Sequence, residues 1–402
     1  MKNVITVKAD FDFLPGEQTI GHLEVDTIAG RGDRFMFTFD KDWISAHPDI
    51  VLDPSLSSSS AYFSSSMNIP FLSDLMPDRW GRILISRHEA RLAEKEGIKP
   101  RTCSDLDYLL KSDDMTRKGG IRLQREDGTY FSSEGVSIPP VSKLGDYIDM
   151  VADYEKNGTG CTWLEDFFSS SSSLGGARPK INVIDTEGNL WIAKVPSLND
   201  QYDIGAWEKV AMDLARKAGI ETPQTMLIAH GNGYHTFLSK RFDRKNGKRI
   251  HMASALCLLN FKNSNDASFL DIAEIISQYS KQPETDLKEL YRRLVFSAMI
   301  NNTDNHLRNH SFLLTPDGWI LSPAYDLNPS IHGRESVLAI DEGIHIFTME
   351  AIVETSLFYN LEQAEAMTII DEVSDAVSQW ESMARSFGLA KEVPLMRSAF
   401  GL

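Results

Sequence analysis

The stretch "NNTDNHLRNHSF", residues 301–312, places Asp304 and Asn309 five positions apart. This D-x-x-x-x-N spacing suits phosphoryl transfer, in which the aspartate accepts or orients a hydroxyl proton and the asparagine oxygen ligates a magnesium ion. Asp326 follows the two apolar runs around the turn "TPDG", residues 315–318, and is the natural second magnesium ligand. Taken alone, Asp304 and Asn309 have a simpler explanation, because Asp and Asn commonly cap or turn the end of a helix.

Three features before residue 301 fit the same chemistry. The segment "SSSSSLGGARPK", residues 169–180, joins two glycines to a lysine, Lys194 lies on the second strand of a predicted hairpin, and Glu208 lies near the start of the next helix. In kinases, such a lysine neutralises nucleotide phosphates and such a glutamate positions the lysine. The glycine segment alone predicts an ordinary turn, since it matches neither GxxxxGK[ST] nor GxGxxG.

The order of these parts is more informative than any one of them. A glycine-rich loop, a strand lysine, a helix glutamate, a second hairpin, Asp-x4-Asn, another hairpin and a final aspartate follow one another as in a kinase of two lobes. Independent turns and caps predict no such order. The sequence has no HRD triplet and no DFG triplet, so it does not indicate an ordinary eukaryotic-type protein kinase.

Length and composition indicate a globular protein. A chain of 402 residues, 42% of them hydrophobic, is long enough for two or three domains. The formal charge of -16 opposes non-specific binding to nucleic acid and anionic membranes, which disfavours direct DNA binding as the main role. Cys103, Cys161 and Cys257 lack metal-binding spacing and are expected to be buried thiols in a reducing compartment. Without a signal-type N-terminus or an apolar run of about 18 residues, we expect a cytoplasmic protein with no membrane partner.

Hydrophobic periodicity predicts an α+β chain, with a mixed, β-rich N-terminal lobe and a mainly helical C-terminal lobe. A small antiparallel sheet is expected over residues 1–45, and an irregular connection over 55–70. Helices are expected over residues 75–95, 205–219, 287–302 and 361–388, and hairpins over residues 180–195, 225–242 and 310–326.

Three rival sites are less well supported by the sequence. His306 and His310 could ligate zinc, but no third ligand is evident. A Ser-His-Asp hydrolase would need a GxSxG motif, which is absent. The basic run "KRFDRKNGKR", residues 240–249, could touch DNA or could be the solvated flank of a hairpin.

The segments "SSLGGARPK" (172–180), "NTDNHLRNH" (302–310) and "PAYDL" (323–327), in this order, resemble the HipA family of bacterial serine/threonine kinases, the toxins of HipBA-type toxin–antitoxin systems. The resemblance covers almost the whole chain and includes "LMPDRWGRILISR" (75–87) and "DYLLKSDDMTRKGGIR" (107–122). It implies a bilobal, protein-kinase-like fold with an extra N-terminal β subdomain. The implied parts are an N-terminal subdomain, a nucleotide-binding lobe and a helical catalytic lobe, over residues 1–110, 111–250 and 251–402.

The resemblance also implies a site for ATP and Mg²⁺. Asp304 is the expected catalytic base, Asn309 and Asp326 are the expected metal ligands, and Glu208 is a supporting residue. The residues expected to contact the nucleotide are Gly175, Gly176, Ala177, Arg178, Pro179, Lys180, Lys194, Lys240, Arg241, Phe242, His306, Leu307, Arg308, Asn309, Tyr325 and Asp326.

Ser173 matches the serine that family members phosphorylate on themselves, a modification that ejects the glycine-rich loop and switches the kinase off. A phosphoserine adds about 1.5 to 2 negative charges, which would repel the phosphates of ATP unless the loop moved. Because residues 169–172 are also serines, the phosphate could be spread over more than one hydroxyl.

The implied substrate is a protein, for which an aminoacyl-tRNA synthetase is the candidate, and the implied outcome is growth arrest or persistence. The implied partner is a helix-turn-helix antitoxin of HipB type, with operator DNA bound mainly through that antitoxin. Two alternatives stay open: a chain that acts chiefly as a corepressor held by the antitoxin, and a kinase for small molecules, because a fold does not decide between substrates.

Overall fold

The computed structural model describes residues 2–28, 32–56, 61–64, 67, 69–133, 138–157, 171–174, 176, 178–230 and 233–401. The chain divides into two compact units. The first comprises Met1–Leu198 and Asp243–Ala253, and the second comprises Asn199–Phe242 and Ser254–Leu402. Each unit has its own set of buried apolar side chains.

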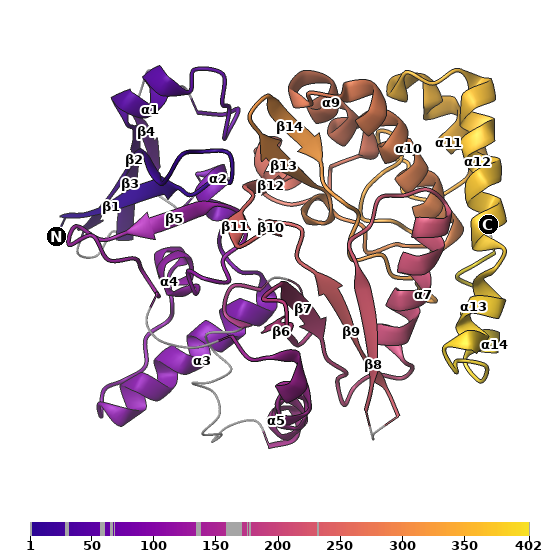
Figure 1. Ribbon diagram of the computed structural model, residues 1–402, viewed down its shortest axis with the longest axis horizontal. Helices are drawn as coiled ribbons and strands as arrows, with labels where there is room; N and C mark the ends of the chain where they lie inside the picture. The colour runs from indigo at the N-terminus through magenta and orange to yellow at the C-terminus, as the bar shows by residue number, and fades with distance from the viewer. Residues whose placement is uncertain are drawn as a thin grey trace. The chain divides into compact units, whose positions relative to one another are not determined.

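The first unit begins with a five-stranded antiparallel sheet in the order β4-β3-β2-β1-β5 (Figure 1). Ile5, Val7 and Ala9 are at most 2% exposed, because alternate side chains of a strand share one face. The sheet predicted over residues 1–45 is therefore confirmed. The irregular connection predicted over 55–70 is wrong at β4, since pairing with β3, rather than any local pattern, defines this short strand. The strands are β1 (Lys2–Ala9), β2 (Gln18–Ile28), β3 (Gly32–Phe39), β4 (Tyr62–Ser64) and β5 (Ile121–Gln124).

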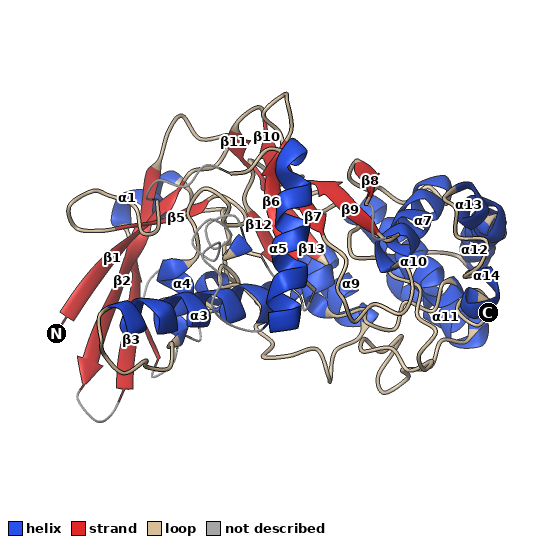
Figure 2. Cartoon of the chain, turned by 90° about the horizontal axis from the view of Figure 1, so that it is seen from below, coloured by secondary structure: helices blue, strands red, loops and turns tan. Residues whose placement is uncertain are grey.

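Among the described residues of the first unit, the longest helix is α3 (Arg79–Lys95), which starts directly after Asp78 and confirms the helix predicted there. It buries Trp80, Leu84 and Ile85, residues at helical spacing, and it lies beside α4 (Figure 2). The other helices described in this unit are α1 (Lys41–Ala46), α2 (Pro70–Ser73), α4 (Asp105–Lys111), η1 (Val141–Lys143) and α5 (Leu144–Asn157).

The predicted hairpin over 180–195 is confirmed as β6 (Lys180–Ile184) and β7 (Leu190–Lys194). The carboxylate of Asp185 holds its turn, because it accepts hydrogen bonds from the backbone N–H of Asn189 at 2.8 Å and from the indole N–H of Trp191 at 2.8 Å. Short strands follow at β10 (Arg244–Lys245), β11 (Lys248–Arg249) and β12 (Met252–Ser254).

The second unit is mainly helical, and α12 packs on both α7 and α10 (Figure 1). Trp207, Val210 and Leu214 of α7 are at most 1% exposed, as their spacing predicted. The hairpins β8–β9 and β13–β14 confirm the two predicted in this part of the chain. The elements are α7 (Ile204–Lys217), β8 (Thr225–Ala229), β9 (His235–Lys240), α8 (Ala255–Leu258), α9 (Phe269–Tyr279), α10 (Pro283–Met299), η2 (Leu307–Asn309), β13 (Ser311–Thr315), β14 (Gly318–Leu321), α11 (Met349–Glu354), η3 (Thr355–Tyr359), α12 (Gln363–Val377), α13 (Trp380–Ser386) and α14 (Val393–Met396).

The single helix expected over 361–388 is wrong, because the chain forms α12 and α13 with a break at Ser378 and Gln379. The Ser378 hydroxyl donates to the backbone carbonyl of Asp375 at 2.7 Å, a local bond that competes with the helix's own ladder. After the break, the Trp380 ring stacks on Phe400 with centroids 4.4 Å apart. Among the helices described, none is long and apolar enough to cross a membrane.

Candidate functional site

The loop that follows α10 carries the Asp304 and Asn309 pair. Asn301 starts it in the left-handed conformation, with φ of 50°, and its side-chain amide donates to the backbone carbonyls of Ser330 at 2.7 Å and Gly333 at 2.9 Å. These bonds fix the direction in which the chain leaves the helix. Asp304 then lies exposed to solvent.

Asn309 turns back toward Asp304. Its side-chain N–H donates to the backbone carbonyl of Asp304 at 3.1 Å, and its backbone N–H donates to the carbonyl of His306 at 2.8 Å. Because the amide nitrogen is the donor, the amide oxygen of Asn309 can serve as a metal ligand. Helix α10 ends before both residues, and His306 holds the N-cap position of η2.

The segment after β14 is joined to this loop. Tyr325 donates its hydroxyl proton to the carbonyl of Arg308 at 2.6 Å, and its ring lies 5.6 Å from that of Phe242. Asp326 has φ of 59°, and its carboxylate accepts a hydrogen bond from the Asn328 side chain at 3.0 Å. The second unit thus brings together five of the predicted nucleotide and metal residues: Phe242, Arg308, Asn309, Tyr325 and Asp326.

His310 is a core residue and not a zinc ligand. Its ring is 4% exposed, and its Nε2 lies 2.8 Å from the side-chain oxygen of Asn305. Burial, assisted by the positive charges of Arg293 and His306, lowers the pKa of His310 to about 3, so the ring is neutral near pH 7. In the part of the chain that the structure describes, no three His, Cys, Asp or Glu side chains gather as a metal site. Two oxygen donors, Asn309 and Asp326, suit Mg²⁺, which commonly completes its shell with water and substrate phosphates.

The glycine-rich loop lies in the first unit, and two of its predicted residues, Gly175 and Ala177, are outside the described residues. Gly176 has φ of 78°, and a Cβ there would collide with the Lys180 ammonium group. The backbone conformation therefore favours a glycine at this position, whereas the Lys180 side chain could move away from a Cβ.

Two lysines face each other across the strands that follow the loop. Lys180 pairs in register with Lys194, so both side chains leave the same face of the β6–β7 hairpin. Two ammonium groups therefore belong to one face of this hairpin. The adjoining Arg178 and Pro179 bind the chain after β7, since the Arg178 guanidinium donates to the Val195 carbonyl at 3.3 Å and the Val195 N–H donates to the Pro179 carbonyl at 3.1 Å.

The other predicted residues occupy the second unit. Glu208 on α7 is 3% exposed and Arg241 is 6% exposed, while Lys240 ends β9. Leu307 is fully buried, and its N–H donates to the Ser264 hydroxyl at 3.0 Å. Because Lys194 and Glu208 belong to different units, the pairing proposed for them stays a prediction.

The basic run over 240–249 includes the β10–β11 hairpin, in which Lys245 and Lys248 are exposed as a solvated hairpin flank would have them, while Arg244 and Arg249 are bound by other residues. Arg249 is 6% exposed and bonded to the backbone carbonyl of Asp114 at 2.9 Å, and Arg244 contacts the carboxylate of Asp243 at 2.9 Å. These contacts bind two arginine side chains that, from the sequence alone, could have faced solvent or DNA.

Some residues around the loop were not predicted. The Trp80 N–H donates to the Gly176 carbonyl at 3.0 Å, the Trp80 indole donates to the Lys180 carbonyl at 3.1 Å, and Ser173 donates to Thr116 at 2.7 Å. No local pattern marks these contacts, because the partners lie far apart in the sequence.

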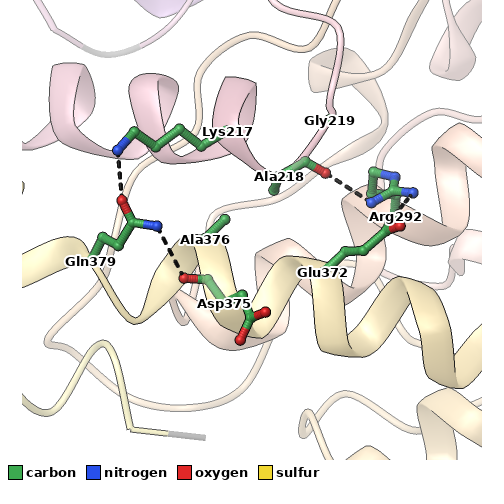
Figure 3. Close-up of a pocket in the computed structure, with 8 residues that line it drawn as sticks. All are labelled: Lys217, Ala218, Gly219, Arg292, Glu372, Asp375, Ala376 and Gln379. Atoms are coloured by element: carbon green, nitrogen blue, oxygen red, sulfur yellow. Dashed lines mark hydrogen bonds and ion pairs between the residues drawn. The ribbon is translucent and has the colours of Figure 1, made fainter.

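A cavity of about 530 Å³ opens in the second unit at the C-terminal end of α7 (Figure 3). Arg292 crosses it, donating to the Ala218 carbonyl at 2.8 Å and pairing with Glu372 at 2.6 Å. None of the predicted site residues lines the cavity, so we assign it no part in the chemistry. Its lining consists of Lys217, Ala218, Gly219, Arg292, Glu372, Asp375, Ala376 and Gln379.

This fold has a solved counterpart. The structure of the Shewanella oneidensis toxin–antitoxin system, described as HipA, HipB and its operator DNA complex, matches with a TM-score of 0.70 at 17% identity, over 98% of this chain and 95% of that one. The predicted α+β, HipA-like and kinase-like fold is thereby confirmed.

Family models identify the chain itself. The HipA-like C-terminal domain matches residues 172–380, and the HipA N-terminal domain matches residues 13–109. The chain therefore belongs to the HipA family. The division into parts over 1–110, 111–250 and 251–402 stays a prediction.

Curated relatives are distant. The "Putative kinase Y4dM" of Sinorhizobium fredii is 26% identical over 81% of this chain and 79% of that protein. The "Serine/threonine-protein kinase toxin HipA" of Shewanella oneidensis is 22% identical over 78% of this chain and 73% of that protein. A "Putative kinase" of Haemophilus influenzae is 27% identical over 38% of this chain, and the match spans about half of that relative, 51%.

Proposed function

We propose that this chain is an ATP- and Mg²⁺-dependent serine/threonine protein kinase and the toxin of a HipBA-like system. The observation that carries the proposal is the joining of two loops by the Tyr325 and Arg308 hydrogen bond. One loop offers Asp304 and Asn309, and the other offers Asp326, which together are the base and the oxygen ligands that phosphoryl transfer needs. Family membership and the kinase names of the relatives support the same activity.

In this proposal Asp304 accepts the proton of the substrate hydroxyl, which its exposed position permits. Asn309 and Asp326 would hold Mg²⁺, which supplies charge neutralisation at the phosphates. Lys180 and Lys194, paired across the β6–β7 hairpin, would hold the negative phosphate oxygens.

Regulation and substrate follow from the family. We propose that Ser173 is autophosphorylated for self-inactivation and that the external substrate is a translation protein such as an aminoacyl-tRNA synthetase, whose modification arrests growth. The support is that the Shewanella oneidensis relative is named a serine/threonine-protein kinase toxin.

Transfer of radiolabelled phosphate from ATP tests the activity. Wild-type protein is expected to label itself and its substrate, and Asp304→Asn is expected to lower the rate by about 10²–10⁴-fold, the range for loss of a general base. Equal incorporation by the two proteins would refute the assignment of Asp304. Phosphoproteomics after induction identifies the substrate, and a target outside translation would refute the synthetase proposal.

A second candidate is a corepressor that binds an antitoxin on operator DNA. The observation in its favour is that the solved structure with this fold was obtained with HipB and operator DNA. A pure scaffold does not need to bind nucleotide, so the melting temperature with and without MgATP separates the two functions: a rise supports the kinase, since a ligand that binds only the folded state stabilises it.

A further inference from the structure

The side chain of Glu392 reaches the first turn of α7, 185 residues away from Trp207 in the sequence. Its carboxylate accepts a hydrogen bond from the Trp207 indole N–H at 2.7 Å and from the Asp203 backbone N–H, which lies 3.2 Å from each carboxylate oxygen. Trp207 is 1% exposed, and an indole N–H can only donate. A buried donor of this kind needs an acceptor, and Glu392 supplies a charged one.

Glu392 bonds to α7 rather than to its own helix. It is the N-cap residue of α14, where its side chain makes no capping hydrogen bond. The dipole of a helix favours a negative charge at its N-terminus, and α7 is the longer helix, with 14 residues against 4 in α14. The Glu392 side chain therefore stabilises the start of α7.

The neighbouring carboxylate, that of Asp203, is bound to other donors. One of its oxygens accepts from the backbone N–H groups of Ala206 and His235, each at 3.1 Å. Its other oxygen contacts the ring Nδ1 of His235. Asp203 therefore caps α7 and ties it to β9, while the Trp207 indole is bound by Glu392.

The C-terminal part of the chain also packs along α7. The Trp207 ring lies 6.2 Å from that of Trp380 and 6.1 Å from that of Phe400, and α13 packs on α7 (Figure 1). At the other end of the helix, the Lys217 ammonium group donates to the side-chain oxygen of Gln379 at 2.6 Å. The position of α7 in the second unit therefore depends on residues from 379 onward.

Glu208 directly follows Trp207 and is 3% exposed. We propose that Glu392 is a positioning residue: by holding Trp207 at the start of α7, it sets the place of the Glu208 carboxylate, which is expected to orient the phosphate-binding lysine. This inference rests on the proposed kinase function. It assigns the C-terminal end of the chain, which carries none of the expected catalytic residues, a part in nucleotide use.

The short separation between Trp207 and Glu208 makes this positioning effective. Neighbouring Cα atoms are about 3.8 Å apart, so a displacement of one residue on the helix displaces the next by nearly the same amount. A hydrogen bond between an ammonium group and a carboxylate spans only about 2.7–2.9 Å. A shift of the first turn of α7 by about 1 Å is therefore enough to weaken the contact expected of Glu208.

Two substitutions at Glu392 compare loss of the hydrogen bonds with loss of the charge alone. Glu392→Gln keeps a side-chain oxygen that can accept from Trp207, and is expected to hold kcat/KM for ATP within about threefold of wild type. Glu392→Ala is expected to lower kcat/KM for ATP about tenfold, mainly through KM, as the misplacement of a contact predicts. Wild-type kinetics in Glu392→Ala, or equal losses in both variants, overturn the proposal.

A double substitution tests whether Glu392 acts through Glu208. In a Glu208→Gln background, Glu392→Ala is expected to change kcat/KM by less than about twofold, because the residue through which it acts is already impaired. A further loss of about tenfold in this background would show that the two residues act independently, and would overturn the assignment.

Tyr291→Phe is the matched control for a purely structural effect. It removes another buried hydrogen bond of the second unit, from the Tyr291 hydroxyl to the Ile352 carbonyl at 3.2 Å, and joins α10 rather than α7 to its neighbour. It is expected to lower the melting temperature and to keep kcat/KM within about twofold of wild type. If it lowers kcat/KM as much as Glu392→Ala does, loss of stability explains the effect and the proposal fails.

Hydrogen–deuterium exchange of the full chain without nucleotide tests the positioning without relying on catalysis. Glu392→Ala is expected to raise the exchange of amides over 203–210 about tenfold, and Glu392→Gln should keep wild-type exchange there. Wild-type exchange over this range in Glu392→Ala overturns the proposal. If wild-type protein neither binds ATP nor transfers phosphate, the kinase function fails, and the exchange result by itself decides whether Glu392 holds α7.

Discussion

The hydroxyl of Tyr325 donates a hydrogen bond of 2.6 Å to the backbone carbonyl of Arg308, and the Ser311 hydroxyl lies 2.6 Å from the same Tyr325 oxygen. Asn309 directly follows Arg308 in the sequence, and Asp326 directly follows Tyr325. These two residues are the expected metal ligands. This contact joins two loops that the sequence separates by a hairpin. Two oxygen ligands can act on one ion only if their loops keep this register.

Tyr325→Phe removes that hydroxyl and leaves the Arg308 carbonyl without this hydrogen-bond donor. We expect the free energy of unfolding to fall by about 1–2 kcal/mol, and the Mg²⁺ concentration for half-maximal transfer to rise more than the KM for ATP. Denaturant unfolding and a magnesium titration of the initial rate measure the two effects. The matched control is Tyr359→Phe, whose buried hydroxyl has no hydrogen-bond partner within the described part of the chain and whose loss should not destabilise. Equal destabilisation by both variants would argue against a special role for Tyr325.

Two substitutions at Asp326 separate the effect of its backbone conformation from the effect of its carboxylate charge. It has φ of 59°, a region that Asn tolerates and Ala does not. Asp326→Asn is expected to lose phosphate transfer with little change in stability, because it gives up the metal-binding charge and keeps an oxygen that can accept from Asn328. Asp326→Ala is expected to lose transfer and also about 1 kcal/mol of stability. Appreciable transfer by Asp326→Asn would remove Asp326 from the metal site.

A substitution at Gly81 tests the contact between α3 and residues 172–174. Gly81→Ala places a Cβ 2.5 Å from the Pro77 side chain and against the Ser172 and Leu174 carbonyls, and is expected to destabilise by about 1–3 kcal/mol, despite the better helix propensity of Ala. Gly145→Ala in α5 meets nothing within 4 Å and is expected to be neutral or stabilising. Thermal unfolding of both variants makes the comparison. If Gly81→Ala is as stable as wild type, the close approach of this turn to residues 172–174 is wrong.

The lowered pKa of His310 predicts that the stability of the fold depends on pH. Its pKa is lowered from 6.5 to about 3 in the folded chain, so between these values the unfolded chain binds a proton that the folded chain does not. Stability must therefore fall as the pH falls below about 6.5, by up to about 1.4 kcal/mol per pH unit from this group.

Denaturant unfolding at pH 7, 6 and 5 measures this slope, and His310→Gln is expected to flatten it. His332→Gln, at an exposed position, should keep the wild-type slope. His251 in the first unit also has its pKa lowered to about 3, by burial, and maintains part of the slope in both variants. An unchanged slope in His310→Gln would mean that the ring is protonated in the folded chain.

Local patterns predicted most elements of the fold. The stripe of α7 and the alternation of β6 and β7 are properties of neighbouring residues, and each element formed as expected. The predictions were wrong where strand pairing or hydrogen bonds, rather than the local sequence pattern, determined the structure. β4 exists because β3 supplies its partner, and α12 ends at Ser378, whose hydroxyl bonds to the Asp375 carbonyl. The arginines of 244–249 appeared free to meet solvent because their partners, such as Asp114, lie far away along the chain.

The amino-acid sequence by itself determined the spacing of Asp304 and Asn309, the order of the candidate chemical parts and the family, since a five-residue separation confines two side chains to one loop whatever surrounds it. Only the tertiary structure decided what holds that chemistry in place. Tyr325 reaches Arg308 across a hairpin, Thr116 reaches Ser173 across 57 residues, and Trp80 reaches Lys180 across 100. Contacts at such separations depend on how packed elements bring distant backbone together, and no local preference of either partner records them.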